Sequence, residues 1–215
     1  FCGVKTGRPG NVDWEEPEKV AQSIKIMKIK HAVITSVDRD DLKDMGSIIW
    51  NETIKAIRRL NPNTTLETLI PDFQGNKTNI DRIIEAAPEV VSHNLETVRR
   101  LTREVRVQAK YDKSLEVLQY LKKMGVNRTK SGIMLGLGEK EEEIYETLHD
   151  LRNASVEVVT IGQYLQPTKK HLPVKSFISP DTFKRYETVA KDLGFRHVES
   201  GPLVRSSYKA HKHVN

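Results

Sequence analysis

The sequence of 215 residues is long enough for one sizeable hydrophobic core, and its 37% hydrophobic and 30% charged residues are typical of a globular domain. No apolar run approaches the roughly 20 residues that a membrane-spanning helix requires, so we expect no membrane partner. The formal charge of +6 comes from mixed acidic and basic residues without a basic motif interleaved with aromatic residues, so we expect no nucleic-acid partner.

Read in order, the sequence alternates amphipathic runs with short β-branched runs. The predicted elements are a helix over 17–27, a strand over 32–37, a helix over 46–60, a strand over 64–70, a helix over 79–86, a strand over 90–94, a helix over 111–124, a strand over 133–137, a helix over 139–152, a strand over 156–165 and a helix over 179–193. Pro17 suits a first helical turn, Pro62 stops the second helix, and Gly125 and Gly194 each end one. A further strand is expected before the turn at residues 201–202.

Strands that alternate with helices predict parallel βα units with right-handed crossovers. At least five units are visible, and a sixth strand is expected to precede or contain Phe1. This number fits either an open doubly wound sheet or an incomplete barrel, and periodicity alone does not separate the two. In both architectures ligands bind at the carboxyl ends of the strands, so the site is predicted there.

Polar side chains collect where the predicted strands end. They are Thr35, Ser36, Asn94, Glu96, Glu139, Gln163 and Tyr164. Each alone is explained by a helix cap, a tight turn or a structural hydrogen bond. Together at one rim they predict a site for a polar, zwitterionic ligand with ribose hydroxyls, and Arg106 and Lys130 are cations that can pair with a ligand carboxylate. No HxxxH, CxxC or paired-carboxylate motif indicates a metal hydrolase or a glycosidase.

Several long segments then match a known family. The opening FCGV of residues 1–4, followed by GRP at 7–9, resembles the end of the CxxxCxxC loop of radical S-adenosylmethionine (SAM) enzymes, in the form found in lipoyl synthases. Further segments similar to that family are 32–42 (AVITSVDRDDL), 67–75 (ETLIPDFQG), 93–98 (HNLETV) and 129–134 (TKSGIM). The end, GPLVRSSYKA at 201–210, resembles the C-terminal RSSYxA element of lipoyl synthases.

The resemblance implies a partial (β/α)6 TIM-like barrel of the radical SAM type over 1–198 and a C-terminal tail over 199–215 that carries the RSSYxA element. It also implies a sulfurtransferase that inserts two sulfur atoms at C6 and C8 of a protein-bound octanoyl group to give the lipoyl cofactor. The cofactors would be SAM and two 4Fe-4S clusters. One cluster would reduce SAM to a 5′-deoxyadenosyl radical, and the auxiliary cluster would be the sulfur source.

The family's functional residues carry over onto matching positions. Cys2 aligns with the third cysteine of the radical cluster, and thiolate is the ligand that such clusters prefer. Ser207 is the expected ligand of the auxiliary cluster, with Ser206 as second choice. The expected SAM-binding residues are Thr35, Ser36, Asn94, Glu96, Arg106, Glu139 and Tyr164. No residue is assigned as a general acid or base. The motif's other cysteines would precede Phe1, so we expect the chain to be an N-terminally truncated fragment that is inactive alone.

The expected partners are octanoylated lipoyl-carrier domains, namely glycine cleavage H protein and 2-oxoacid dehydrogenase E2, and a reductant such as flavodoxin or ferredoxin. A single cysteine suits a reducing compartment, so we expect the cytoplasm of a bacterium, or the mitochondrion or plastid of a eukaryote. Two alternatives stand beside this reading. One is another radical SAM enzyme, against which the GRP and RSSYxA elements argue. The other is a non-catalytic copy without clusters that only docks acidic carrier domains.

Overall fold

The computed structural model describes residues 3, 7 and 9–214, and in this part of the chain six parallel strands form one sheet. The strands are β1 (His31–Thr35), β2 (Thr65–Leu69), β3 (Val90–Ser92), β4 (Arg128–Leu135), β5 (Val158–Gln163) and β6 (His197–Gly201). The sixth strand is therefore the one expected before residues 201–202. The strand expected to contain Phe1 lies outside the described residues. β6 spans positions 198 and 199, where the boundary between barrel and tail was expected.

Most of the helices connect successive strands, while one precedes β1 and a short one follows β6. The α-helices are α1 (Glu16–Ile26), α2 (Ser47–Leu60), α3 (Lys77–Glu85), α4 (Thr102–Val105), α5 (Tyr111–Lys123), α6 (Glu141–Asn153) and α7 (Pro180–Asp192), and the short 3-10 helices are η1 (Phe73–Gly75), η2 (Arg99–Leu101) and η3 (Ala210–Lys212). Local sequence explains where α7 begins, because the Ser179 hydroxyl accepts a hydrogen bond from the Thr182 N–H at 3.1 Å and Pro180 occupies the first turn.

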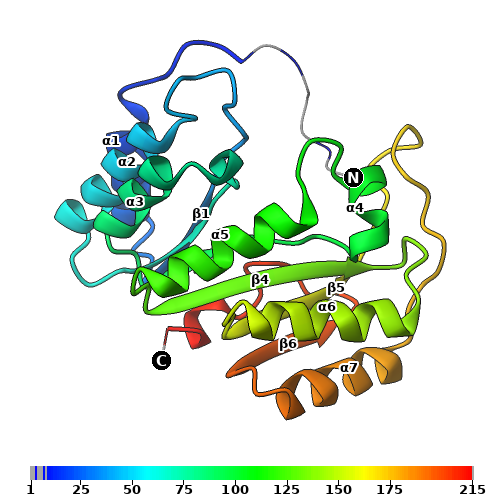
Figure 1. Ribbon diagram of the computed structural model, residues 1–215. Helices are drawn as coiled ribbons and strands as arrows, with labels where there is room; N and C mark the ends of the chain where they lie inside the picture. The colour runs from blue at the N-terminus through cyan, green and yellow to red at the C-terminus, as the bar shows by residue number, and fades with distance from the viewer. Residues whose placement is uncertain (1–2, 4–6, 8, 215) are drawn as a thin grey trace.

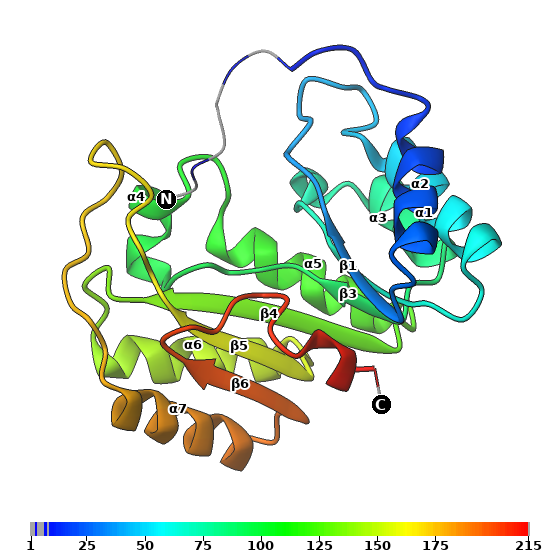
Figure 2. The same ribbon diagram turned by 180° about the vertical axis from the view of Figure 1, so that it is seen from behind.

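The strand order identifies the architecture as a partial barrel. Each strand is hydrogen-bonded to the next one along the chain, from β1 to β6, without the reversal that defines a doubly wound sheet. Helices α5, α6 and α7 lie on one side of β4, β5 and β6, and the chain that follows β6 lies on the other side (Figures 1 and 2). This tail runs back across the barrel interior until η3 packs against β1. The partial TIM-like barrel expected from the resemblance is confirmed.

Apolar side chains fill the space between the sheet and its helices in two clusters of described residues. One cluster joins α1, α2 and α3 to the first strands, and the fully buried Ile54, Leu66 and Ile83 belong to it. The other joins α5, α6 and α7 to β4 and β5, and includes Leu148, Val159 and Phe183. Each such side chain contributes roughly 1.5–3 kcal/mol when fully buried. No helix in the described part of the chain is both long and apolar enough to cross a membrane.

Strand β4 begins five residues earlier than the apolar run at 133–137 predicts. Its first residues are polar and yet buried, because long-range partners satisfy them. Arg128 donates to Glu157 at 2.8 Å, and the Lys130 Nζ lies 2.8 Å from Glu67 Oε1. The expectation that Lys130 pairs with a ligand carboxylate is therefore wrong, since its ammonium pairs with a carboxylate of the protein.

Candidate active site

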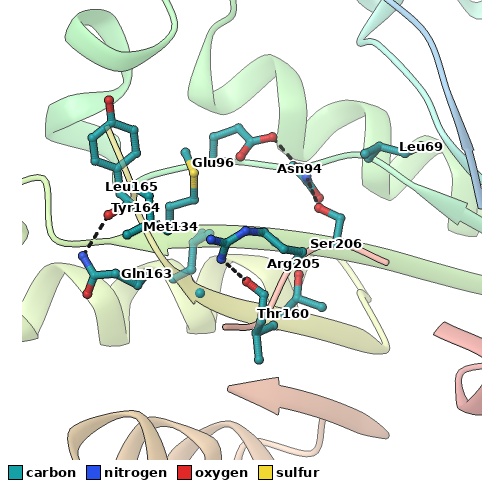
Figure 3. Close-up of a pocket in the computed structure, with 14 residues that line it drawn as sticks. Leu69, Asn94, Glu96, Met134, Thr160, Gln163, Tyr164, Leu165, Arg205 and Ser206 are labelled. Atoms are coloured by element: carbon teal, nitrogen blue, oxygen red, sulfur yellow. Dashed lines mark hydrogen bonds between the residues drawn. The ribbon is translucent and has the colours of Figure 1, made fainter. Parts of the chain in front are cut away.

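A pocket of about 250 Å³ opens inside the barrel at the carboxyl ends of β3, β4 and β5 (Figure 3). It is lined by Leu69, Asn94, Glu96, Gly132, Ile133, Met134, Thr160, Gly162, Gln163, Tyr164, Leu165, Val204, Arg205 and Ser206. The last three belong to the tail that follows β6. The walls of the pocket thus come from β2, from the segment that follows β3, from β4 and β5 with the residues after it, and from the tail.

The tail is held against the barrel by specific contacts. Asn94 Nδ2 donates to Ser206 Oγ at 2.9 Å and to Glu96 Oε1 at 3.0 Å, and Figure 3 shows Asn94 between these two side chains. At Gly162, an added Cβ would lie 2.4 Å from the carbonyl oxygen of Val204, so only glycine lets the tail backbone approach β5 this closely. Ser206 therefore lies in the pocket wall and does not trail in solvent. Ser207 is the next residue and is exposed.

Asn94 and Glu96 are the sequence-predicted residues that present polar groups to the pocket. The Oδ1 atom of Asn94 is buried and has no hydrogen-bond partner within the described protein. Such an orphaned acceptor costs free energy unless a ligand or water satisfies it. Burial raises the pKa of the Glu96 carboxyl, against the opposing effects of the Asn94 hydrogen bond and of Arg106. Glu96 also has a backbone φ of +67°, an uncommon conformation for a non-glycine residue.

Tyr164 and Gln163 line the pocket while their polar groups bind the following loop. The Tyr164 ring is buried and points away from Ser206, and its hydroxyl donates to the Leu172 carbonyl at 2.9 Å. The Gln163 side chain donates to the Ser176 carbonyl at 3.1 Å and accepts from the Ile178 N–H at 2.9 Å. Both residues therefore fix the loop over 164–178 against the end of β5.

The other SAM candidates follow strand ends but are not among the residues that line this pocket. Thr35 and Ser36 are exposed at the end of β1, where the Ser36 hydroxyl accepts from Trp50 Nε1 at 3.0 Å. Glu139 accepts from the N–H groups of Gly136 and Leu137 at 2.9 and 3.1 Å, which closes the turn after β4.

Arg106 is not among the pocket-lining residues and bridges the segment after β3 and helix α5. Its guanidinium donates to Ser114 Oγ at 3.1 Å and to the Leu95 carbonyl at 3.3 Å. Burial lowers its pKa, while Glu96 and Asp72 act in the opposite direction. Its positive charge acts on the Glu96 carboxyl and opposes the rise in pKa that burial causes there.

Sequence reasoning missed pocket residues that lie inside strands and not at their ends. Gly132 and Met134 on β4 and Thr160 and Gly162 on β5 each stand two residues apart. Alternate residues of a strand share one face, so this two-residue period is the signal that places them on the inner face of the barrel. Small residues there leave room, because a Cβ on Gly132 would lie 2.5 Å from Thr160 Oγ1.

The iron-sulfur expectations fall largely beyond the described chain. Cys2 lies outside the described residues, and its role as a cluster ligand stays a prediction. Within 3, 7 and 9–214, no group of three or more His, Cys, Asp or Glu side chains is placed to hold a metal ion. The pocket suits SAM better, because it offers an unsatisfied buried acceptor, a carboxylate and glycine-lined space.

Comparison with known proteins assigns a family. Residues 1–151 match the model of the Radical SAM superfamily. Over its full length the chain is 79% identical to "Lipoyl synthase, mitochondrial" of Nematostella vectensis and 80% identical to the lipoyl synthase of Flavobacterium johnsoniae, and it covers 74% of each. The lipoyl synthase of Parabacteroides distasonis is 53% identical, with 76% of its length covered.

Solved structures at low identity share the fold. SuiB of Streptococcus suis bound to precursor peptide SuiA aligns with a TM-score of 0.71 at 12% identity, covering 98% of this chain and 47% of that one. Methylornithine synthase aligns with a TM-score of 0.66 at 14% identity, covering 95% of this chain and 67% of that one. At this low identity the structural alignments show only that the fold is shared. The relatives at 53–80% sequence identity are all lipoyl synthases and therefore identify the family. The chain therefore belongs to the radical SAM superfamily and, within it, to the lipoyl synthase family.

Proposed function

We propose that the chain provides the SAM-binding barrel and the serine-bearing tail of a lipoyl synthase, which inserts two sulfur atoms at C6 and C8 of a protein-bound octanoyl group. The observation that carries this proposal is the tail inserted into the barrel, with Ser206 in the wall of the pocket and Ser207 beside it. A barrel that only docked carrier domains would have no use for a serine hydroxyl brought into its lumen with the help of the close approach at Gly162.

Asn94 and Glu96 are the proposed polar contacts for SAM. The free Oδ1 of Asn94 is suited to accept a hydrogen bond from an amino or hydroxyl group, and the Glu96 carboxylate adds a second acceptor beside it. Tyr164 and Met134 supply apolar surface that keeps water from the bound ligand. Thr35, Ser36, Arg106 and Glu139 remain proposed contacts for the part of SAM that extends beyond this pocket.

When SAM and reduced 4Fe-4S iron are bound, they supply the radical chemistry that removes hydrogen from unactivated carbon. We propose two clusters, with Cys2 as a ligand of the one that acts on SAM and Ser207 as a ligand of the auxiliary one. An oxygen ligand holds iron-sulfur less firmly than thiolate does, which suits a cluster that gives up its sulfur. We keep the division of the chain into a barrel over 1–198 and a functional tail over 199–215 as part of this proposal.

The octanoylated substrates that we propose are glycine cleavage H protein and the E2 component of 2-oxoacid dehydrogenases, with flavodoxin or ferredoxin as reductant. We place the protein in the cytoplasm of a bacterial source, or in the mitochondrion or plastid of a eukaryotic one. Relatives from bacteria and one described as mitochondrial support these two settings.

Paired serine variants test the proposal in the protein that carries the complete set of cluster cysteines. Ser207→Ala should abolish lipoyl product, while cleavage of SAM to 5′-deoxyadenosine persists and the iron content falls by about one cluster. Ser206→Ala is the comparison variant and should lose less product than Ser207→Ala, because the Ser206 hydroxyl is already bonded to Asn94. If both variants form lipoyl product at the unmutated rate, the assignment of the serine ligand is wrong.

A further inference from the structure

Lys130 and Glu67 form a fully buried ion pair within the barrel, and neither residue lines the pocket. Both side chains are 0% exposed, and the ammonium lies 2.8 Å from Oε1 and 3.0 Å from Oε2 of the carboxylate. Removing two charges from water costs several kcal/mol per ion, and apolar side chains of similar volume are often at least as stabilising. Stability alone is therefore a poor reason for this pair.

The ammonium has one donor beyond the two that Glu67 takes. A lysine ammonium carries three N–H groups, and the third donates to the backbone carbonyl of Ser206 in the tail. The carboxylate is oriented in turn, because Ser92 Oγ donates to Glu67 Oε1 at 2.7 Å. A chain of hydrogen bonds from Ser92 through Glu67 to Lys130 thus ends on one main-chain oxygen of the tail.

A second contact fixes the same residue from the pocket side. Asn94 Nδ2 reaches the hydroxyl of Ser206, while Lys130 holds its carbonyl. The hydroxyl and the backbone carbonyl of Ser206 are therefore both bound to the barrel, and these two contacts set the orientation of its backbone. Because Ser207 follows directly, this orientation also constrains the position of the Ser207 backbone, from which the hydroxyl extends.

We propose that the Lys130–Glu67 pair is a positioning device that fixes the tail backbone at Ser206 and so presents Ser207 at the mouth of the pocket. A charged donor is suited to this task, since a hydrogen bond from an ion is about twice as strong as one between neutral groups. The anchoring itself stands on the contacts above. Only the purpose of presenting Ser207 rests on the proposed function.

Hydrogen exchange tests the anchor without reference to activity. The double variant Lys130→Met with Glu67→Gln removes both charges and keeps an acceptor for Ser92. The amides of Tyr208 and Ala210, which bond to tail carbonyls at 2.8 and 3.3 Å, should exchange about tenfold faster, the factor expected for loss of one charged hydrogen bond. Amides of β5 should be unchanged.

Lys122→Met is the matched control. It removes another Lys–Glu pair, at 2.7 Å, that lies between α5 and the start of β5 and away from the tail. Its tail amides should exchange at the unmutated rate. If the double variant does not fold, Glu67→Gln alone keeps the side-chain shape and should still speed tail exchange by about threefold, because the ammonium loses its charged partner.

Unchanged tail exchange in a folded Lys130 or Glu67 variant would overturn the proposal. In the enzyme with its clusters, the double variant should form lipoyl product at least about tenfold more slowly. Faster tail exchange together with unchanged sulfur insertion would support the anchor and instead overturn the role given to Ser207. Hydrogen exchange therefore tests the anchoring of the tail, and the rate of sulfur insertion tests the role of Ser207.

Discussion

His213 makes the stability of the protein sensitive to acid in a way that can be calculated. Its side chain is fully buried near the base of the barrel, and neither ring nitrogen has a hydrogen-bond partner in the described chain. Burial lowers its pKa from 6.5 to about 3, and the positive charges of Lys130, His197, His31 and His211 act in the same direction. The folded protein therefore keeps this imidazole neutral at pH values where the unfolded chain protonates it.

This difference in pKa between the folded and unfolded states decides how the free energy of unfolding changes with pH. Above pH 6.5 the ring is neutral in both states and the site leaves the free energy of unfolding unaffected. Between pH 6.5 and 3 only the unfolded state gains the proton, so stability is lost as the pH falls. At pH 5 the loss from His213 is about 2 kcal/mol. His93, also buried, has a pKa lowered to about 4 by burial and by Arg106, and it adds a similar loss.

Urea unfolding at pH 8 and pH 5 measures the effect. His213→Phe keeps a ring of similar size without a titrating group, and should shrink the difference between the two pH values by about 2 kcal/mol. Any packing cost of the new ring is common to both pH values and cancels. His149→Gln, on the exposed face of α6, is the control and should retain the unmutated difference. If His213→Phe retains it as well, the buried neutral histidine is not the cause.

Two further substitutions probe the pocket and the tail. Gly162→Ala places a methyl group against the Val204 carbonyl, so urea unfolding should show a loss of about 1–3 kcal/mol, and an unchanged midpoint would contradict the close approach. Asn94→Ala should weaken SAM binding about tenfold in calorimetry, because it removes the unsatisfied acceptor, while circular dichroism stays that of the unmutated protein. Equal SAM affinity would remove Asn94 from the site.

The order of strands and helices was predictable from local pattern, but the bounds of β4 and the choice of architecture were not. Residues 128–131 are polar, so a short window treats them as a loop. Their partners Glu67 and Glu157 lie 63 and 29 residues away in the sequence, where no local rule can find them. Likewise, a barrel and an open sheet differ in the order of their strands. Which strands become neighbours depends on the whole chain and not on any local segment.

The candidate site was predictable where strand ends meet the pocket. Asn94, Glu96 and Tyr164 follow strands and line it. Thr160 was missed because it lies within a strand, where a polar side chain is expected to make a structural hydrogen bond and not to line a pocket. Glu139 also follows a strand, but its carboxylate is occupied by the turn that it closes.

The inserted tail also affects the order in which the chain is expected to fold. The hydrogen bonds that complete the pocket join Ser206 to residues 112 and 76 positions earlier, the kind of distant pairing that closes the longest loops and forms slowly. The six strands can pair with their neighbours before those bonds exist. A barrel at that stage is open along its lumen, and a bulky cofactor can enter from the side that the tail later covers. We therefore expect the segment that lines the pocket to dock last during folding and to detach first when the structure loosens.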